Sequence, residues 1–356
     1  MGRFRASRRR AGESRRRVVL GLAAVWAIAV AGCEGQAPTP QSSDKLSTGA
    51  TVVFIGPPKG GLYWRAILGG AVKTLSTFPA IRLEPLVPAD DTDNALRDTI
   101  DRALSLKPDV LCLYTTDTDR ITDVAQRLFD AGVPLITVGP GPKIEKCATH
   151  VRIDLAGGAN LLGKQLPAIL GDRHSYVLVS CQGRSRIDTE CYVRFKQGAR
   201  QHSGIHLLDE RCAAKSEDEM ADQIRDMLAI FPHTALVVTL RPDVWFDHDP
   251  VMLLRDNTRL ATLGASPQLW PLLRSGRAAA LCGPIDGQIG GAVADAAIVV
   301  ITHSRPFSTV HTISCELVRP DSFDDFARRY AKASGLPLSA LLPSASSRPA
   351  RPASAP

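Results

Sequence analysis

The residues best suited to holding a small molecule follow the first strand expected along the chain. Residues 51–55 form a short apolar run, and a loop of glycine and proline, 56–62, comes after it. Tyr63 and Trp64 then open an amphipathic helix. Ligands of open α/β sheets lie at the carboxyl ends of strands, so these flat rings could bury an apolar ligand face at low entropic cost. The alternative is that both rings pack under the helix as core.

Charged and polar side chains occupy similar loops further along. The candidate ligand-binding residues are Lys59, Tyr63, Trp64, Tyr114, Asp117, Arg194, Arg241 and Asp243. Lys59 precedes Gly60 and Gly61, whose exposed N–H groups favour anions, so an anionic or phosphorylated ligand is one hypothesis. The other interpretation is that these are solvated charges, with Asp117 capping a helix and Asp243 ordering a turn.

Signatures of catalysis are missing from the sequence. It contains no GxSxG or P-loop motif and no convincing metal-binding constellation, and residues 56–61 do not match GxGxxG. We therefore expect a protein that is not an enzyme, with no catalytic residue, no cofactor and no metal site.

The first 33 residues are typical of an export signal. An arginine-rich stretch, 1–17, precedes an apolar run, 18–31, that is too short to span a bilayer comfortably. Small residues come just before Cys33, which indicates a lipobox with Cys33 as the lipidated residue. The alternative is an ordinary signal with an incidental cysteine. Residues 14–19 also resemble a twin-arginine export signal, although arginine pairs arise by chance in basic segments.

The same segment accounts for the charge of the whole protein. Residues 1–32 contain eight arginines and one glutamate, which equals the net charge of +7, so the remainder is neutral. The charge therefore gives no reason to expect a nucleic-acid partner. We expect residues 1–33 to be a lipoprotein signal peptide and 34–49, rich in Pro, Ser, Thr and Gln, to be a flexible tether.

From residue 50 to about 333, short apolar runs alternate with amphipathic helical patterns. This alternation predicts parallel βαβ units in two doubly wound, Rossmann-like α/β lobes. Residues 310–318 read as one longer strand, and 322–332 read as a terminal helix. Residues 336–356, mostly Pro, Ser and Ala, are expected to be a disordered tail.

Several local patterns carry a family resemblance in their order and spacing. They are the aromatic pair Tyr63 and Trp64, the strand and TTDTD loop at 109–119, the strand 131–138, and the segment 150–154. Together they resemble the aromatic pair, the "TDSD" loop, the "GIPVVTVD" strand and the first hinge crossing of type I periplasmic sugar-binding proteins of the ribose/galactose type. The resemblance covers about residues 50–333.

The resemblance implies two lobes joined by a hinge of three crossings. The N-terminal lobe would comprise 50–153 and 284–308, and the C-terminal lobe 154–283 and 309–335. It also implies a non-enzymatic, exported and lipid-anchored protein of the cell envelope or periplasm. Such a protein binds a sugar or related compound between its lobes and delivers it to an ABC permease or a membrane sensor.

The chain departs from the family at most positions that hold sugar hydroxyls. Those positions carry Gly139, Pro140, Pro242, Ser266 and Pro284. The alternative function is therefore a degenerate binding-protein fold with a signalling or structural role and no sugar affinity. The effector core of a lactose-repressor-type regulator shares this fold, but it would need a helix-turn-helix where residues 1–33 stand.

Overall fold

The protein is described by a computed structural model that covers residues 49–58, 60–116, 121–181, 185–303 and 310–342. These residues belong to the second of two compact units, which divide the chain after Thr39. The expected signal peptide with Cys33, most of the tether, Lys59 and Asp117 lie outside the described residues.

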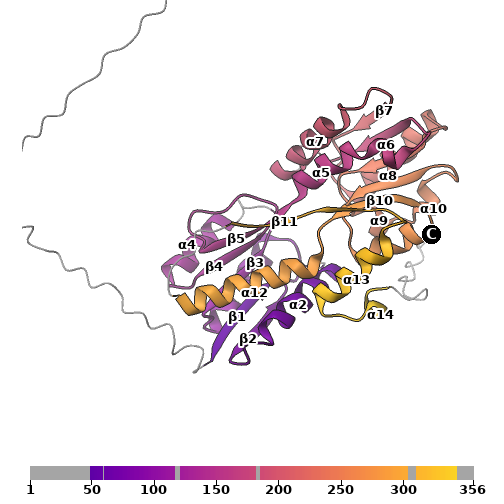
Figure 1. The fold of residues 1–356 in the computed structure, drawn as a ribbon. Helices are drawn as coiled ribbons and strands as arrows, with labels where there is room; N and C mark the ends of the chain where they lie inside the picture. Colours follow the sequence, from indigo (N-terminus) through magenta and orange to yellow (C-terminus); the bar gives the residue numbers. More distant parts are fainter. Residues whose placement is uncertain (1–48, 59, 117–120, 182–184, 304–309, 343–356) are drawn as a thin grey trace, which may run out of the picture. The chain divides into compact units, whose positions relative to one another are not determined.

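The N-terminal lobe is built on a parallel sheet of six strands in the order β11-β5-β4-β3-β1-β2 (Figure 1). Its strands are β1 (Ala50–Ile55), β2 (Ile81–Leu86), β3 (Val110–Tyr114), β4 (Leu135–Gly139), β5 (Thr149–Asp154) and β11 (Val310–Ser314). Its helices are α2 (Gly61–Leu75), α3 (Asp93–Ser105), α4 (Thr122–Asp130) and α12 (Asp286–His303).

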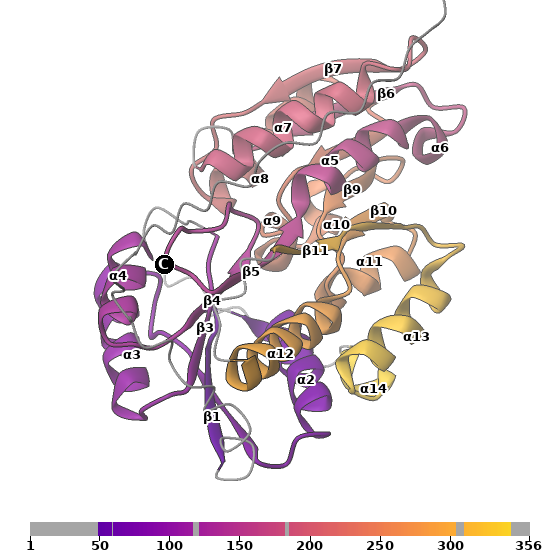
Figure 2. The ribbon, with the colours of Figure 1, turned by 60° about the vertical axis from the view of Figure 1, so that its left-hand side comes forward.

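Burial on both faces explains why the strands of this sheet are apolar almost throughout. Helices α2 and α12 cover one face of the sheet, and α3 and α4 cover the other (Figure 2). Val52 and Phe54 pack in the core beneath α2 and α12, whereas Val53 and Ile55 pack beneath α3 and α4. Successive side chains of a strand point to opposite faces, so a strand between two helical layers needs an apolar residue at nearly every position.

The C-terminal lobe repeats this three-layer arrangement on a sheet with the order β12-β10-β9-β8-β6-β7. Its strands are β6 (Ser175–Val179), β7 (His206–Arg211), β8 (Leu236–Thr239), β9 (Arg259–Leu263), β10 (Ala278–Gly283) and β12 (Glu316–Val318). Its helices are α5 (Leu155–Lys164), α6 (Leu166–Leu170), α7 (Arg186–Ala199), α8 (Glu217–Ile230), α9 (Val244–Asp247), α10 (Pro250–Leu253), the 3₁₀ helix η2 (Pro267–Leu269), α11 (Trp270–Arg274), α13 (Phe323–Ser334) and α14 (Leu338–Leu341). The described strands are parallel except β12, which runs antiparallel to β10.

The chain passes between the two sheets three times. The crossings join β5 to α5, β10 to α12, and β11 to β12. The expected fold class, with two doubly wound lobes and three crossings, is confirmed.

The expected single strand 310–318 is broken at Cys315. Val310–Ser314 pairs with β5 in the N-terminal sheet, and only Glu316–Val318 pairs with β10 in the C-terminal sheet. One straight strand cannot pair with both sheets, so the strand is interrupted where the chain passes from one sheet to the other. This change occurs at Cys315, after the lobe boundary that the sequence predicted at 309.

The tail expected to be disordered contains structure at its start. Pro337 precedes the short helix α14, and Leu341 is fully buried in the same core cluster as Phe326 of α13. The proline- and serine-rich composition obscured two apolar residues, Leu338 and Leu341. Leu341 is buried in the core that contains α13, and Leu338 is partly buried against it. Residues 343–356 lie outside the described part of the chain.

Helices α2 and α12 approach so closely that their backbones touch. A Cβ added to Gly70 would lie 2.0 Å from the carbonyl oxygen of Gly287, and one added to Gly290 would lie 1.7 Å from that of Ile67. Glycine removes the side chains that would keep the helices apart. The close contact fixes the position of α2, which carries Tyr63 near its start, relative to α12. Helix α12 itself begins directly after a crossing.

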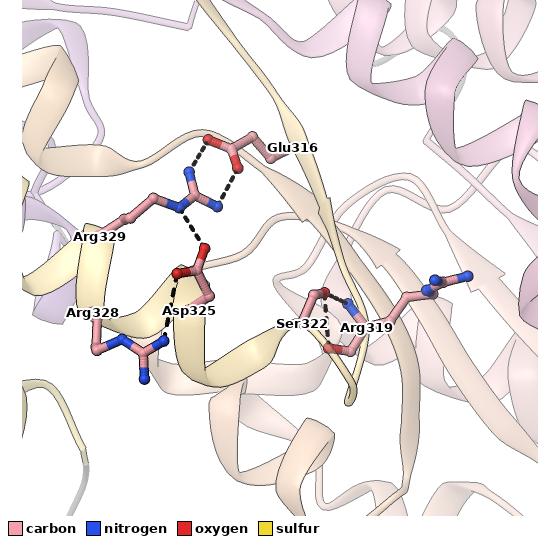
Figure 3. A network of polar contacts seen from close by, with 6 residues as sticks. All are labelled: Glu316, Arg319, Ser322, Asp325, Arg328 and Arg329. Atoms are coloured by element: carbon pink, nitrogen blue, oxygen red, sulfur yellow. Dashed lines mark hydrogen bonds and ion pairs between the residues drawn. The ribbon is translucent and has the colours of Figure 1, made fainter.

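Helix α13 connects this pair to the C-terminal lobe (Figure 2). Its Tyr330 packs edge-on against Trp270, with ring centroids 5.1 Å apart, and the Lys73 ammonium of α2 donates to the Lys332 carbonyl at 2.6 Å. On its outer side, Arg329 donates to both oxygens of Glu316 at 2.8 and 2.7 Å, which fastens α13 to β12 (Figure 3).

We predict that Gly290→Ala destabilises the protein by about 1–3 kcal/mol, because the added methyl group must push α12 away from α2. Urea unfolding measures this change. The control is Gly204→Ala, since an added Cβ at Gly204 has no neighbour within 4 Å. Equal stability of the two variants would contradict the close contact.

Candidate functional site

Two tyrosines from the N-terminal lobe form a hydrogen-bonded pair. Tyr63 lies in the first turn of α2, and Tyr114 is the last residue of β3. Their ring centroids are 6.2 Å apart, and their hydroxyls are hydrogen-bonded. Burial raises the pKa of both hydroxyls, so both remain protonated at neutral pH. Tyr63 and Tyr114, both predicted from the sequence as site residues, therefore contact each other.

Trp64, the other half of the aromatic pair, points into the core. Its side chain is 6% exposed, and its ring packs edge-on against Phe54 with centroids 4.8 Å apart. A Cβ added to Gly56 would lie 2.3 Å from the indole, so the preceding loop closes over it. Adjacent residues of a helix point about 100° apart, which is why only Tyr63 joins Tyr114.

The C-terminal lobe contributes an arginine held by two carboxylates. Arg241 and Asp243 follow β8, and Arg241 Nε donates to Asp243 Oδ2 at 2.7 Å. Arg241 Nη1 lies 3.7 Å from Oδ2 of Asp188, which is in the first turn of α7. Burial would lower the pKa of Arg241, but the charges of Asp243 and Asp188 outweigh it and raise that pKa.

Asp286 is a residue that sequence reasoning missed. It opens α12 directly after the crossing from β10, it is 7% exposed, and its carboxylate accepts a hydrogen bond from the Tyr330 hydroxyl. Burial raises the pKa of Asp286 to about 7, although the hydrogen bond opposes the shift. An acidic residue just after a strand's carboxyl end was a usable signal; its partner, 44 residues away in the sequence, was not.

These residues come together as one group, which we call the Tyr–Asp cluster: Tyr63, Tyr114, Asp243 and Asp286. The charges of Asp286 and Asp243 both raise the pKa of Tyr63 and of Tyr114, so both carboxylates interact electrostatically with the tyrosine pair. The cluster thus combines the carboxyl ends of strands in both sheets with the first turn of α12. It can donate and accept hydrogen bonds to a polar molecule.

A second polar segment, after β9, approaches the start of α2. Ser266 Oγ and Gln268 Oε1 are shielded from solvent and have no hydrogen-bond partner among the described residues. A Cβ on Gly61 would lie 2.7 Å from Gln268 Nε2, so the two lobes meet at this position. Ser266 stands at one of the departures noted in the sequence.

The remaining predicted site residues do not join the cluster. Arg194 is exposed on α7, where its guanidinium donates to Gln197 at 3.3 Å and its carbonyl accepts from Asn160 at 3.0 Å. None of these partners belongs to the Tyr–Asp cluster. Lys59 and Asp117 lie outside the described residues, so their part in the site stays a prediction.

The described cysteines, including the sequence neighbours Cys181, Cys191 and Cys212, are all free thiols. Burial raises the pKa of Cys191 and of Cys282 to about 12. Within the described ranges, no group of three or more His, Cys, Asp or Glu could hold a metal ion. No helix in this part of the chain is both long and apolar enough to cross a membrane.

We predict that ionisation of Asp286 makes the protein less stable as pH rises. Its pKa is about 7 when folded and about 4 when unfolded. Between these values the folded state holds the extra proton, so unfolding free energy falls by about 2–3 kcal/mol from pH 5 to pH 8.

Asp286→Asn cannot ionise and should lack this decline. Urea unfolding of both proteins at pH 5 and pH 8 measures the difference. Parallel pH dependence in the two proteins would contradict the assignment.

Comparisons with known proteins agree with this architecture. The family described as "Periplasmic binding protein domain" matches residues 52–304. A search of curated protein sequences finds no match.

Among solved structures, a solute-binding protein of an ABC transporter from Agrobacterium vitis, bound with alpha-D-tagatopyranose, is 17% identical with a TM-score of 0.65, over 79% of this chain and 98% of that one. A periplasmic ribose ABC transporter protein from Conexibacter woesei is 15% identical, with a TM-score of 0.67, over 79% and 95%. A putative LacI transcriptional regulator from Bacteroides fragilis is 14% identical, with a TM-score of 0.62, over 78% and 99%.

Identities this low show a shared fold and no more. The family match, in contrast, covers well over half of the chain, including both sheets apart from β11 and β12 and two of the three crossings. The chain belongs to the periplasmic binding protein family.

Proposed function

We propose that this protein is a non-enzymatic solute-binding lipoprotein. It captures a small polar ligand, a carbohydrate or a related compound, between its two lobes and presents it to an ABC importer or a membrane sensor. The observation that carries the proposal is the Tyr–Asp cluster, in which the tyrosine pair of the N-terminal lobe interacts electrostatically with Asp286 at a crossing and with Asp243 of the C-terminal lobe. A ligand held there would contact every part that moves when the lobes close.

The chemistry of the cluster suits a hydroxyl-bearing molecule. Carboxylates accept hydrogen bonds from ligand hydroxyls, and the protonated tyrosine hydroxyls can donate or accept. The ring of Tyr63 can cover an apolar C–H face. The Agrobacterium vitis neighbour is described with a bound sugar, which supports carbohydrate as the first class of compound to test.

Binding without turnover fits the state of the same groups. Burial raises the pKa of the tyrosine hydroxyls, so they stay protonated at neutral pH and are not available to act as bases. Arg241 is engaged by Asp243 and Asp188. These interactions hold side chains in place and do not activate a nucleophile.

Export and anchoring rest on the sequence of the first 33 residues. The basic stretch, the short apolar run and the small residues before Cys33 support a lipid-anchored protein of the cell envelope. The regulator-like neighbour shares the fold, but this N-terminal segment favours the binding protein over a cytosolic regulator.

We predict that Cys33→Ser moves the protein from the membrane fraction to the soluble envelope fraction of its host, because the lipidated side chain is lost. Immunoblotting of fractionated cells measures the change. Cys212→Ser is the control and should leave the distribution unaltered. Membrane retention of the Cys33→Ser variant would contradict lipid anchoring through this residue.

We predict that Tyr63→Ala weakens ligand binding about tenfold or more, since it removes a contact worth roughly 1.4 kcal/mol. Isothermal titration calorimetry with neutral, amino and phosphorylated monosaccharides and with inositols measures the affinity. Phe129→Ala is the control, because that aromatic side chain is 62% exposed on α4. A folded wild-type protein that binds none of these compounds would contradict the proposed function.

A further inference from the structure

The charge balance of the proposed binding site, among the described residues, is negative. Arg241 is its one described cation, and its guanidinium is already engaged by two carboxylates. Asp243 Oδ2 lies 2.7 Å from it, and Asp188 Oδ2 lies 3.7 Å from it. One positive charge between two negative charges leaves an excess of one negative charge at the carboxyl ends of β6 and β8.

Asp286 adds a further carboxyl group on the side of the crossing. It is buried, and its only described hydrogen-bond partner is the Tyr330 hydroxyl, so no described cation pairs with it when it is ionised. The charges of Asp243 and Asp286 both act on the Tyr63 and Tyr114 hydroxyls and raise their pKa.

A ligand of opposite charge would relieve this imbalance. A cation near Asp243 and Asp286 gains Coulomb attraction that is stronger at a partly buried site than in bulk water. The rings of Tyr63 and Tyr114 add electron-rich faces that attract cations. A phosphate would instead meet the same carboxylates and would have to displace one of them from Arg241.

We propose that the ligand of the Tyr–Asp cluster carries a protonated amine on a polar, hydroxyl-bearing skeleton. This inference rests on the proposed function and narrows its ligand class. It is an alternative to the anionic ligand suggested by the sequence around Lys59, a residue outside the described part of the chain.

Matched compounds that differ in one substituent test the inference. Calorimetric titrations would compare glucose with glucosamine and glucose 6-phosphate, and galactose with galactosamine and galactose 6-phosphate, at low and high salt. In at least one series we expect the amine to bind about tenfold or more tighter than the neutral parent, and the phosphate to bind weakest. The advantage of the amine should shrink at high salt.

Asp243→Asn should remove most of that advantage while leaving the affinity for the neutral parent less changed. The matched control is Asp256→Asn, because Asp256 also pairs with an arginine of the same lobe, Arg277 at 3.7 Å, but lies fully exposed before β9. Thermal unfolding of each variant confirms that it is folded.

The outcomes separate the two claims. Equal binding of amine and parent, or tightest binding of the phosphate, overturns the inference and leaves the proposed function intact. An amine advantage that persists in Asp243→Asn overturns the role of this carboxylate. Absence of binding by every compound overturns the proposed function and the inference together.

Discussion

The backbone contact between α2 and α12 is the constraint on which the candidate site depends. Gly70 and Gly290 let the two helices meet without intervening side chains. Helix α2 carries Tyr63 at its start, and α12 carries Asp286 at its start, directly after a crossing between the sheets. A shift between these helices would separate the tyrosine from the carboxylate. Packing between the backbones of the two helices therefore determines whether the site can form.

The same region is joined to the C-terminal lobe by α13. Tyr330 of that helix reaches Asp286 through a hydrogen bond and packs against Trp270. A single buried tyrosine thus links a residue of the candidate site to the core of the other lobe. The Asp286 carboxylate therefore cannot change its hydrogen-bond partner without affecting Tyr330.

The fold followed from the sequence because its evidence is local. Short apolar runs between amphipathic stretches specify buried strands and covering helices wherever they occur. The site was harder to predict, because it depends on direction and on distant partners. Neighbours on one helix diverge, so Tyr63 enters the cluster while Trp64 enters the core. Burial raises the pKa of Asp286, and Tyr330 donates a hydrogen bond to its carboxylate. No sequence pattern within a few residues of Asp286 reveals its burial or this partner.

Native mass spectrometry of the protein purified from its host tests the central claim most directly. If the protein is a solute-binding protein, a fraction of the folded molecules should retain one small molecule, and Tyr63→Ala should lose it. The contradictory result is a folded protein that shows only its own mass, both as purified and after incubation with a small-molecule extract of the host.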